Sequence, residues 1–161
     1  MKHAKLTLLF CLLAAVGALA FVWSQSSPSL PKDAELLAGN TVIARYTGVQ
    51  EQPCRFMTAL CPDRCNHATR LANFEVLENV HYEKNSQYGD DKLAPGDTAV
   101  VDVKKEVIGQ PESVVKTISG LKPGDVVRLT ISHLYVKQGQ GQFPARPAVQ
   151  IELVPQAPAA E

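Results

Sequence analysis

Apolar residues recur at every second position along much of the chain, and this alternation restricts the possible folds more than any other feature. The pattern is typical of strands with one buried face, and β-branched residues, which strands favour, dominate it. It occurs in five segments, at residues 41–49, 74–83, 99–107, 127–135 and 149–153. We expect their apolar faces to form one core that includes Val101, Val103, Leu129, Ile131 and Ile151.

Two similar segments punctuate this pattern, Leu93–Asp97 (Leu-Ala-Pro-Gly-Asp) and Leu121–Asp125 (Leu-Lys-Pro-Gly-Asp). Proline fixes φ at the second turn position, and the following glycine accepts a positive φ, so each segment predicts a tight turn that starts a strand. Helical character is confined to two short stretches, residues 63–72 and 111–119.

Five strands in about 120 residues, with little helix, predict a mainly β domain. We expect a small five-stranded barrel, closed or half-open, with one or two short helical segments. The segment 111–119 falls between the third and fourth strands, which matches the strand order of the oligonucleotide/oligosaccharide-binding (OB) barrel. The prediction is therefore an OB-like barrel, and a small β-sandwich is the alternative.

Residues 1–20 have the features of a secretory signal peptide. Lys2 and Lys5 precede an apolar run, and Ala18-Leu19-Ala20 forms a small-x-small cleavage site. The alternative is an uncleaved membrane anchor, because the apolar stretch continues to about residue 23. After it we predict a flexible linker (21–35), the barrel domain (36–155) and a disordered tail (156–161). The protein is expected to be exported, to the periplasm or outside the cell, and to touch a membrane only through an uncleaved N-terminal segment.

A cysteine cluster lies between the first two predicted strands, in the loop 54–67. Cys54, Cys61 and Cys65 follow the spacing C-x6-C-x3-C, and His67 comes two residues later. In an oxidising compartment two of the thiols can form a disulfide. Three thiolates and an imidazole also make a ligand set for zinc, or a soft set for copper. A third reading is thiol redox chemistry, with Cys61 and Cys65 as attacking and resolving thiols.

Part of this cluster, Cys61-Pro62-Asp63-Arg64-Cys65, resembles the C-P-D-x-C segment of Sco-type copper-delivery proteins. The resemblance covers these five residues and implies that Cys61 and Cys65 hold copper. That family has a thioredoxin-like fold, whose alternation of strands and helices is missing from this chain.

Two residues near the C-terminus are further site candidates. His133 is in phase with Leu129 and Ile131, so its imidazole is expected to point into the core, where it needs a hydrogen-bond partner or a metal. It is a metal-ligand candidate in place of His67 if its end of the barrel is the one near the cysteines. At the other end, backbone or a hydroxyl would satisfy it. Arg146, in a proline-containing extended segment, is a candidate to pair with a carboxylate or an anionic ligand.

The charge balance and the motifs restrict the function. Lys plus Arg and Asp plus Glu are equal at 16 each, which argues against nucleic acid as a partner. The sequence contains no glycine-rich phosphate loop, no serine nucleophile elbow and no HExxH motif. We expect an exported β-barrel binding module without evident catalytic activity, whose Cys-rich loop is braced by a disulfide or binds zinc or copper. The alternatives are a copper/zinc metallochaperone-like protein and a thiol-disulfide oxidoreductase that uses Cys61 and Cys65.

Overall fold

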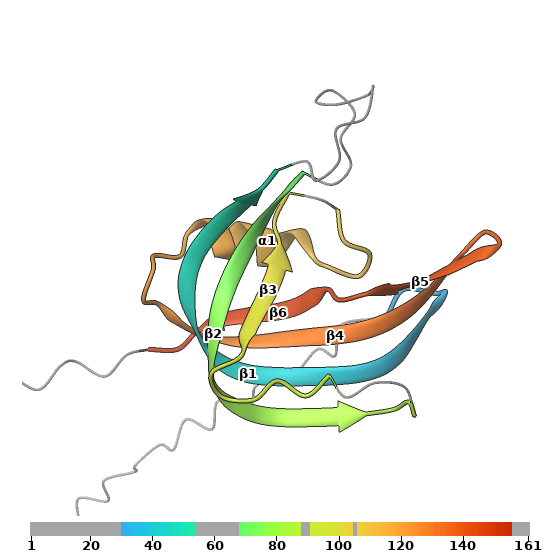
Figure 1. The fold of residues 1–161 in the computed structure, drawn as a ribbon, viewed down its shortest axis with the longest axis horizontal. Coiled ribbons are helices and arrows are strands. Elements are labelled where there is room, and N and C mark those ends of the chain that lie inside the picture. The colour runs from blue at the N-terminus through green and yellow to red at the C-terminus, as the bar shows by residue number, and fades with distance from the viewer. Residues whose placement is uncertain (1–29, 54–67, 88–90, 105, 156–161) are drawn as a thin grey trace, which may run out of the picture.

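The computed structural model describes residues 30–53, 68–87, 91–104 and 106–155. In these ranges the chain is mainly β, with one short helix (Figure 1). The strands are β1 (Ala34–Gln52), β2 (Thr69–Lys84), β3 (Thr98–Asp102), β4 (Val126–Gln138), β5 (Gly141–Ala145) and β6 (Ala148–Leu153). The helix α1 (Glu112–Ser119) joins β3 to β4. The predicted signal peptide and the C-terminal tail lie outside the described residues.

The strands form one antiparallel sheet in the order β3-β2-β1-β4-β5, and β6 also pairs with β4. β5 and β6 follow one another along the same edge of β4, β5 beside residues 134–138 and β6 beside residues 127–131. The sandwich alternative, which requires two sheets, is therefore wrong for the described chain.

The sheet is not closed, so the closed form of the predicted barrel is also wrong. Within the described ranges, β3 pairs only with β2, while β5 and β6 pair only with β4. Pro144 lies in β5, and Pro147 immediately precedes β6. Proline has no N–H to donate to a neighbouring strand, so this edge is poorly suited to a continuous ladder with β3.

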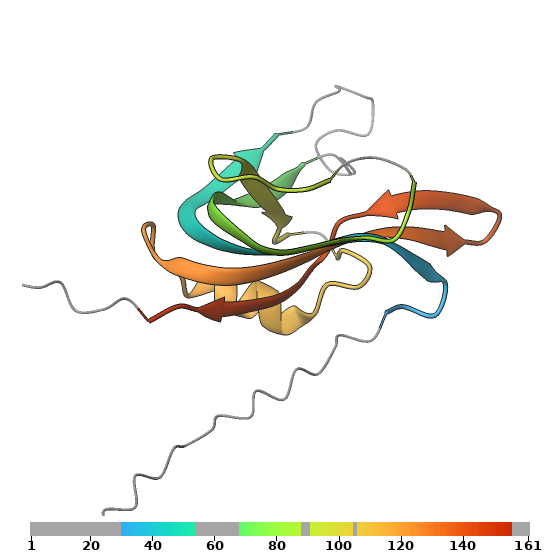
Figure 2. The same ribbon diagram turned by 90° about the horizontal axis from the view of Figure 1, so that it is seen from below.

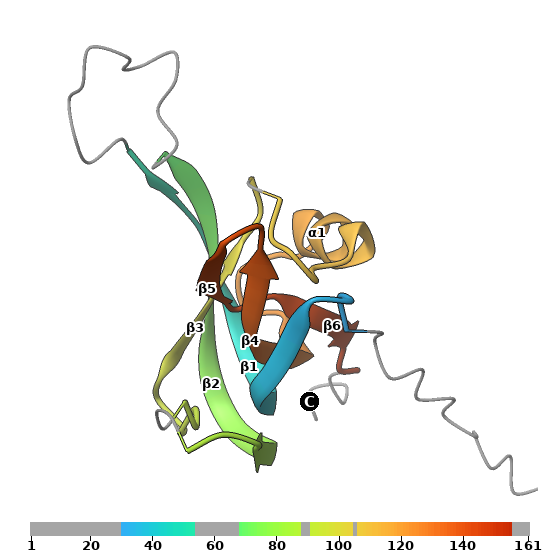
Figure 3. The ribbon, with the colours of Figure 1, turned by 90° about the vertical axis from the view of Figure 1, so that its right-hand side faces the viewer.

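The sheet is strongly bent, which brings distant strands toward a common core. The pairing of β1 with β2 shifts register at three places, between Thr41 and Val42, Ile43 and Ala44, and Tyr46 and Gly48. Such bulges increase local twist and bend the strands. Figure 2 shows the bent sheet from below, with α1 beside β6, and Figure 3 shows β2 and β3 on one side of the molecule and α1 with β6 on the other.

The core fills the concave side of this sheet. Val101 and Leu129 are fully buried, and Val103, Ile131 and Ile151 are half-buried against the same cluster, which confirms the predicted shared core. The helix α1 confirms the segment predicted at 111–119 and adds Val114 and Ile118, four residues apart on one face. The other predicted helix, 63–72, is wrong where the structure describes it, because Thr69–Ala72 pairs with the end of β1.

Both predicted turns are confirmed, and they are built alike. Gly96 and Gly124 have φ of 92° and 100°, and the aspartate after each donates its N–H back across the turn. The carboxylates of Asp97 and Asp125 each accept a 2.7 Å hydrogen bond from the N–H at the start of the same turn. Each turn thus holds itself in the shape that starts the next strand, β3 or β4.

Candidate functional site

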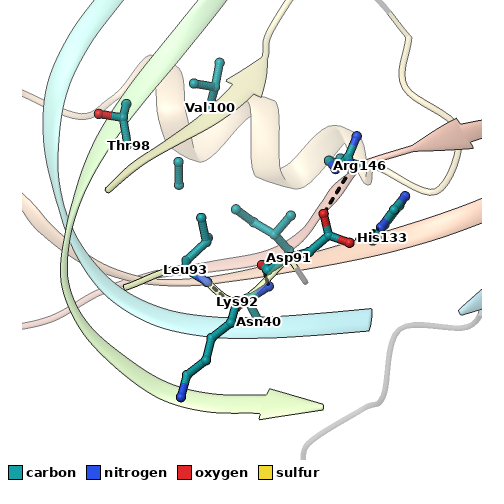
Figure 4. Close-up of a pocket in the computed structure, with 10 residues that line it drawn as sticks. Asn40, Asp91, Lys92, Leu93, Thr98, Val100, His133 and Arg146 are labelled. Atoms are coloured by element: carbon teal, nitrogen blue, oxygen red, sulfur yellow. Dashed lines mark hydrogen bonds and ion pairs between the residues drawn. The ribbon is translucent and has the colours of Figure 1, made fainter. Parts of the chain in front are cut away.

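The opening in the sheet contains a cleft of about 350 Å³ (Figure 4). β3 forms one wall, and the other comes from β4 and the chain between β5 and β6. Leu93, Ala99, Val100 and Ile131 supply apolar surface. The polar lining residues are Asn40, Asp91, Lys92, Thr98, His133 and Arg146. An apolar site of this size with a few converging polar groups is typical of small-ligand pockets.

The segment before β3 is held in the cleft by the side chain of Asn40, which is 5% exposed. Asn40 Nδ2 donates to the carbonyl of Asp91 at 2.8 Å, and its Oδ1 accepts from the N–H of Leu93 at 3.0 Å. Asn79 Nδ2 donates to the same Oδ1 at 3.1 Å and to the carbonyl of Leu93 at 2.7 Å. Two asparagine side chains therefore satisfy a backbone that has no neighbouring strand there, and they fix the position of Asp91.

The carboxylate of Asp91 connects the two walls of the cleft. One oxygen pairs with His133 Nδ1, and the other accepts a 3.1 Å hydrogen bond from Arg146 Nη2. Burial by itself raises the pKa of Asp91, but the hydrogen bonds from His133 and Arg146 and their charges outweigh it, so the pKa lies below its usual value. Asp91 is accordingly a carboxylate at neutral pH.

His133 is oriented by this carboxylate. Since a carboxylate accepts hydrogen bonds, Nδ1 carries a proton in this pair. Nε2 is buried and finds no hydrogen-bond partner among the described residues. A carboxylate–imidazole pair of this kind is how enzymes orient a general base, but a buried Nε2 does not reach a substrate.

The rest of the described lining holds few nucleophilic or metal-ligating side chains. Among the described residues that line the cleft, Thr98 supplies the sole hydroxyl side chain, and none is a cysteine or a serine. Across the described parts of the chain, no three His, Cys, Asp or Glu side chains gather closely enough to hold a metal ion. The arrangement is suited to holding a ligand by shape, hydrogen bonds and charge.

The structure brings together two of the residues singled out from the sequence. His133 lines the cleft with Ile131, in the predicted phase, and its partner is a carboxylate instead of a backbone group or a hydroxyl. Arg146 pairs with the same carboxylate. Cys54, Cys61, Cys65 and His67 lie outside the described residues.

His133 and the described residues that flank the cysteine loop lie at opposite ends of β1. His133 lies opposite Ala38, near the start of β1, whereas the chain leaves β1 at Gln52 and returns at Thr69. For this arrangement, the sequence analysis predicts that His133 takes no part in the chemistry of the thiols.

Asn40, Asn79 and Asp91 were missed by the reasoning from the sequence. A usable signal existed for Asn40, which is in phase with the buried Val42, Ala44 and Tyr46 and is thus a polar residue on the core face of a strand. Asp91 lies in a loop, where no periodicity indicates which way a side chain points.

No helix in the described part of the chain is long and apolar enough to cross a membrane. No protein-family model, curated protein sequence or solved structure matches the chain.

Proposed function

We propose that the protein is a non-catalytic binding module whose ligand occupies the cleft between β3 and the β5–β6 edge. The observation that carries this proposal is the unclosed sheet: two strand edges border an apolar cleft, and Asp91 with its partners is held in place between them. Side chains that are already positioned lose little entropy when a ligand binds, which favours recognition.

An OB-like half-open barrel is the architecture we propose for this module. β1 pairs with both β2 and β4, and α1 joins β3 to β4, as in an OB barrel. β5 and β6 together return along β4 like one interrupted strand. OB barrels bind their ligands beside the second and third strands, and the cleft borders β3.

We further propose that the protein is exported and that the loop 54–67 forms a second, separate feature. The support is in the sequence: the signal-peptide pattern at 1–20 and the spacing of Cys54, Cys61 and Cys65. Export exposes these thiols to an oxidising compartment, which favours a disulfide over a metal site or redox chemistry. A disulfide in so short a loop contributes about 2–3 kcal/mol in the chain-entropy model.

The cleft is tested by methyl NMR with a library of small organic fragments as the probe. We expect bound fragments to shift the methyl resonances of Leu93, Val100 and Ile131, which line the cleft. The resonances of Val114 and Leu134, which are buried elsewhere, serve as the internal control. If no fragment shifts the cleft resonances, or if the shifts cluster elsewhere, the cleft is not the ligand site.

The loop is tested on protein purified from an export-competent host, by thiol counting, elemental analysis and mass spectrometry. Cleavage after Ala20 gives a chain that begins at Phe21 and contains three cysteines. A disulfide leaves one free thiol and no metal, whereas a metal site gives about one zinc or copper per chain. Three free thiols without metal would contradict both forms of the proposal.

A further inference from the structure

We propose that the cleft binds an acidic peptide segment in extended conformation, which adds to β3 as a further strand. This inference rests on the proposed function and gives its ligand a chemical class. Its three supports are the hydrogen-bonding direction of β3, the composition of the strand edges and the charge of the cleft.

The backbone of β3 has unused hydrogen-bonding groups on its outer side. Val103 N–H donates to the carbonyl of Arg70 at 2.9 Å, and Val76 N–H donates to the carbonyl of Asp97 at 2.8 Å. Backbone groups alternate in direction along an antiparallel strand, so Thr98 and Val100, which lie between these contacts, point theirs away from β2. No hydrogen bond to those outward groups occurs in the described structure. Next along the strand, the carbonyl of Asp102 is already covered by Gln110 Nε2, at 2.8 Å.

β3 also lacks the protection against strand addition that the unpaired parts of β2 and β5 carry. Native proteins block their edges with charged residues or proline. The part of β2 beyond β3 has exposed Glu78, Glu83 and Lys84, and β5 contains Pro144. Residues 98–101 of β3 are Thr-Ala-Val-Val, and the side chain of Val100 is 43% exposed. An unprotected edge with free donors and acceptors is the surface that an extended peptide uses when it joins a sheet.

The charge of the cleft favours an acidic segment over a basic one. Among the described residues that line the cleft, the charged ones apart from His133 are Asp91, Lys92 and Arg146, two cations and one anion. Arg146 is 57% exposed, and its guanidinium has further N–H groups besides the one that donates to Asp91. A carboxylate on the peptide that faces Arg146 would add a charge-assisted hydrogen bond. The same positive excess opposes pairing of β3 with β3 of a second copy, because the two clefts would then lie close together.

The test uses a library of random heptapeptides displayed on phage, selected on the purified full chain. Selected peptides are synthesised, and their affinity is measured by fluorescence anisotropy. We expect the selected peptides to be enriched in Asp and Glu, and Val100→Pro to weaken their binding at least tenfold. Proline at this position removes an outward N–H but leaves the ladder to β2 intact, so the variant should fold. Val100→Thr, which keeps the N–H, is the matched control and should bind within about twofold of the original chain.

A second variant keeps the test independent of any effect of proline on folding. Arg146→Gln should weaken binding of the acidic peptides several-fold and reduce the salt dependence of their affinity. Selection of no peptide, or peptides that bind Val100→Pro as well as the original chain, would overturn the inference. Concentration-dependent dimers that Val100→Pro abolishes would instead show a second copy on this edge. If fragments bind the cleft and peptides do not, the proposed function stands and this inference alone fails.

Discussion

Asp91 makes two sets of contacts within the protein, and they depend on different atoms. Its backbone carbonyl is held by Asn40, while its carboxylate joins His133 on β4 to Arg146 just before β6. The segment before β3 is thereby tied to the opposite wall of the cleft. The described sheet has no ladder hydrogen bonds between these walls, so side chains connect them. The Asp91 network is one connection, and Gln110, which bonds the carbonyl of Asp102 and the N–H of Ala148, is another.

We expect Asp91→Asn to destabilise the protein by about 1–2 kcal/mol at neutral pH, since the half-buried His133 and the exposed Arg146 lose an ionised acceptor. The pKa of Asp91 is lowered on folding, so its stabilisation is present above the unfolded value of 3.8 and is lost as the pH falls through the folded value. The difference between the two proteins in urea unfolding should therefore shrink between pH 5 and pH 2.5. Glu78→Gln, at an exposed carboxylate of β2, should show no such difference at either pH. An Asp91→Asn penalty that stays constant with pH would contradict this role for the carboxylate.

Asn40 should matter more for stability than its neighbours on β1. Asn40→Ala leaves the carbonyl of Asp91 and the N–H of Leu93 without their Asn40 partner in a partly buried position, which costs about 2–3 kcal/mol. Thr41→Ala is the control, because it removes only a 3.2 Å hydroxyl contact with Thr130 and should cost under about 1 kcal/mol. Equal losses of stability in denaturant unfolding would show that the hydrogen bonds from Asn40 to residues 91–93 add no stability beyond that of an ordinary contact.

At the scale of elements, the two turns and α1 could be predicted from the sequence because their signals are local. A proline-glycine pair sets its own backbone, and the Val114–Ile118 spacing needs only one buried face. β5 was missed because its sequence, Gly-Gln-Phe-Pro-Ala, does not alternate, and its strand form comes from pairing with the end of β4. Val80 lies in the alternating segment 74–83, in phase with Phe74 and Val76, but is 42% exposed, since bulges in the β1–β2 pairing change the phase before it.

The candidate site was less predictable than the fold for a related reason. Arg146 and His133 could be singled out, but their common partner, Asp91, lies in a loop. The path of that loop depends on Asn40 and Asn79, which lie on two different strands. Interactions between segments some fifty residues apart leave no periodic trace in a single sequence.

The glycines of the two turns should be equally sensitive to substitution. Gly96→Ala and Gly124→Ala place a Cβ in open space, so the expected cost of about 1–2 kcal/mol comes from the positive φ alone. Gly120→Ala, at the end of α1, has a φ of −92° and ordinary contact with the Thr117 carbonyl at 3.5 Å. The free energy of unfolding of this control, measured by thermal unfolding, should fall by less than about 0.5 kcal/mol or rise slightly. A loss at Gly120 as large as at Gly124 would show that backbone strain is not the cause.

In the molecule as a whole, β1 runs between the cleft that contains His133 and the start of the cysteine loop. From the sequence alone, His133 and the cysteines could have formed one site. Fourteen residues separate Ala38, opposite His133, from Gln52, where the chain enters the cysteine loop. At about 3.3 Å per residue this is roughly 45 Å of strand path. The cleft and the loop are therefore expected to work as independent sites on one bent sheet.

This independence is tested by exchanging variants and readouts. His133→Ala should leave metal content and cysteine reactivity unchanged at each pH, while it lowers stability by about 1–2 kcal/mol because Asp91 loses one of its donors. His67→Ala and the triple change of Cys54, Cys61 and Cys65 to Ser should affect the metal content or the thiol chemistry, and the triple change should also remove the stability that a disulfide contributes. In both variants the methyl resonances of Leu93 and Ile131 should stay in place. Substitutions at distant sites without shared partners normally have additive effects on stability. When His133→Ala is combined with the triple change, the two changes in unfolding free energy should therefore add to within about 0.5 kcal/mol. A fall in bound metal or in thiol reactivity in His133→Ala would instead place the imidazole beside the cysteines and contradict the separation of the two sites along β1.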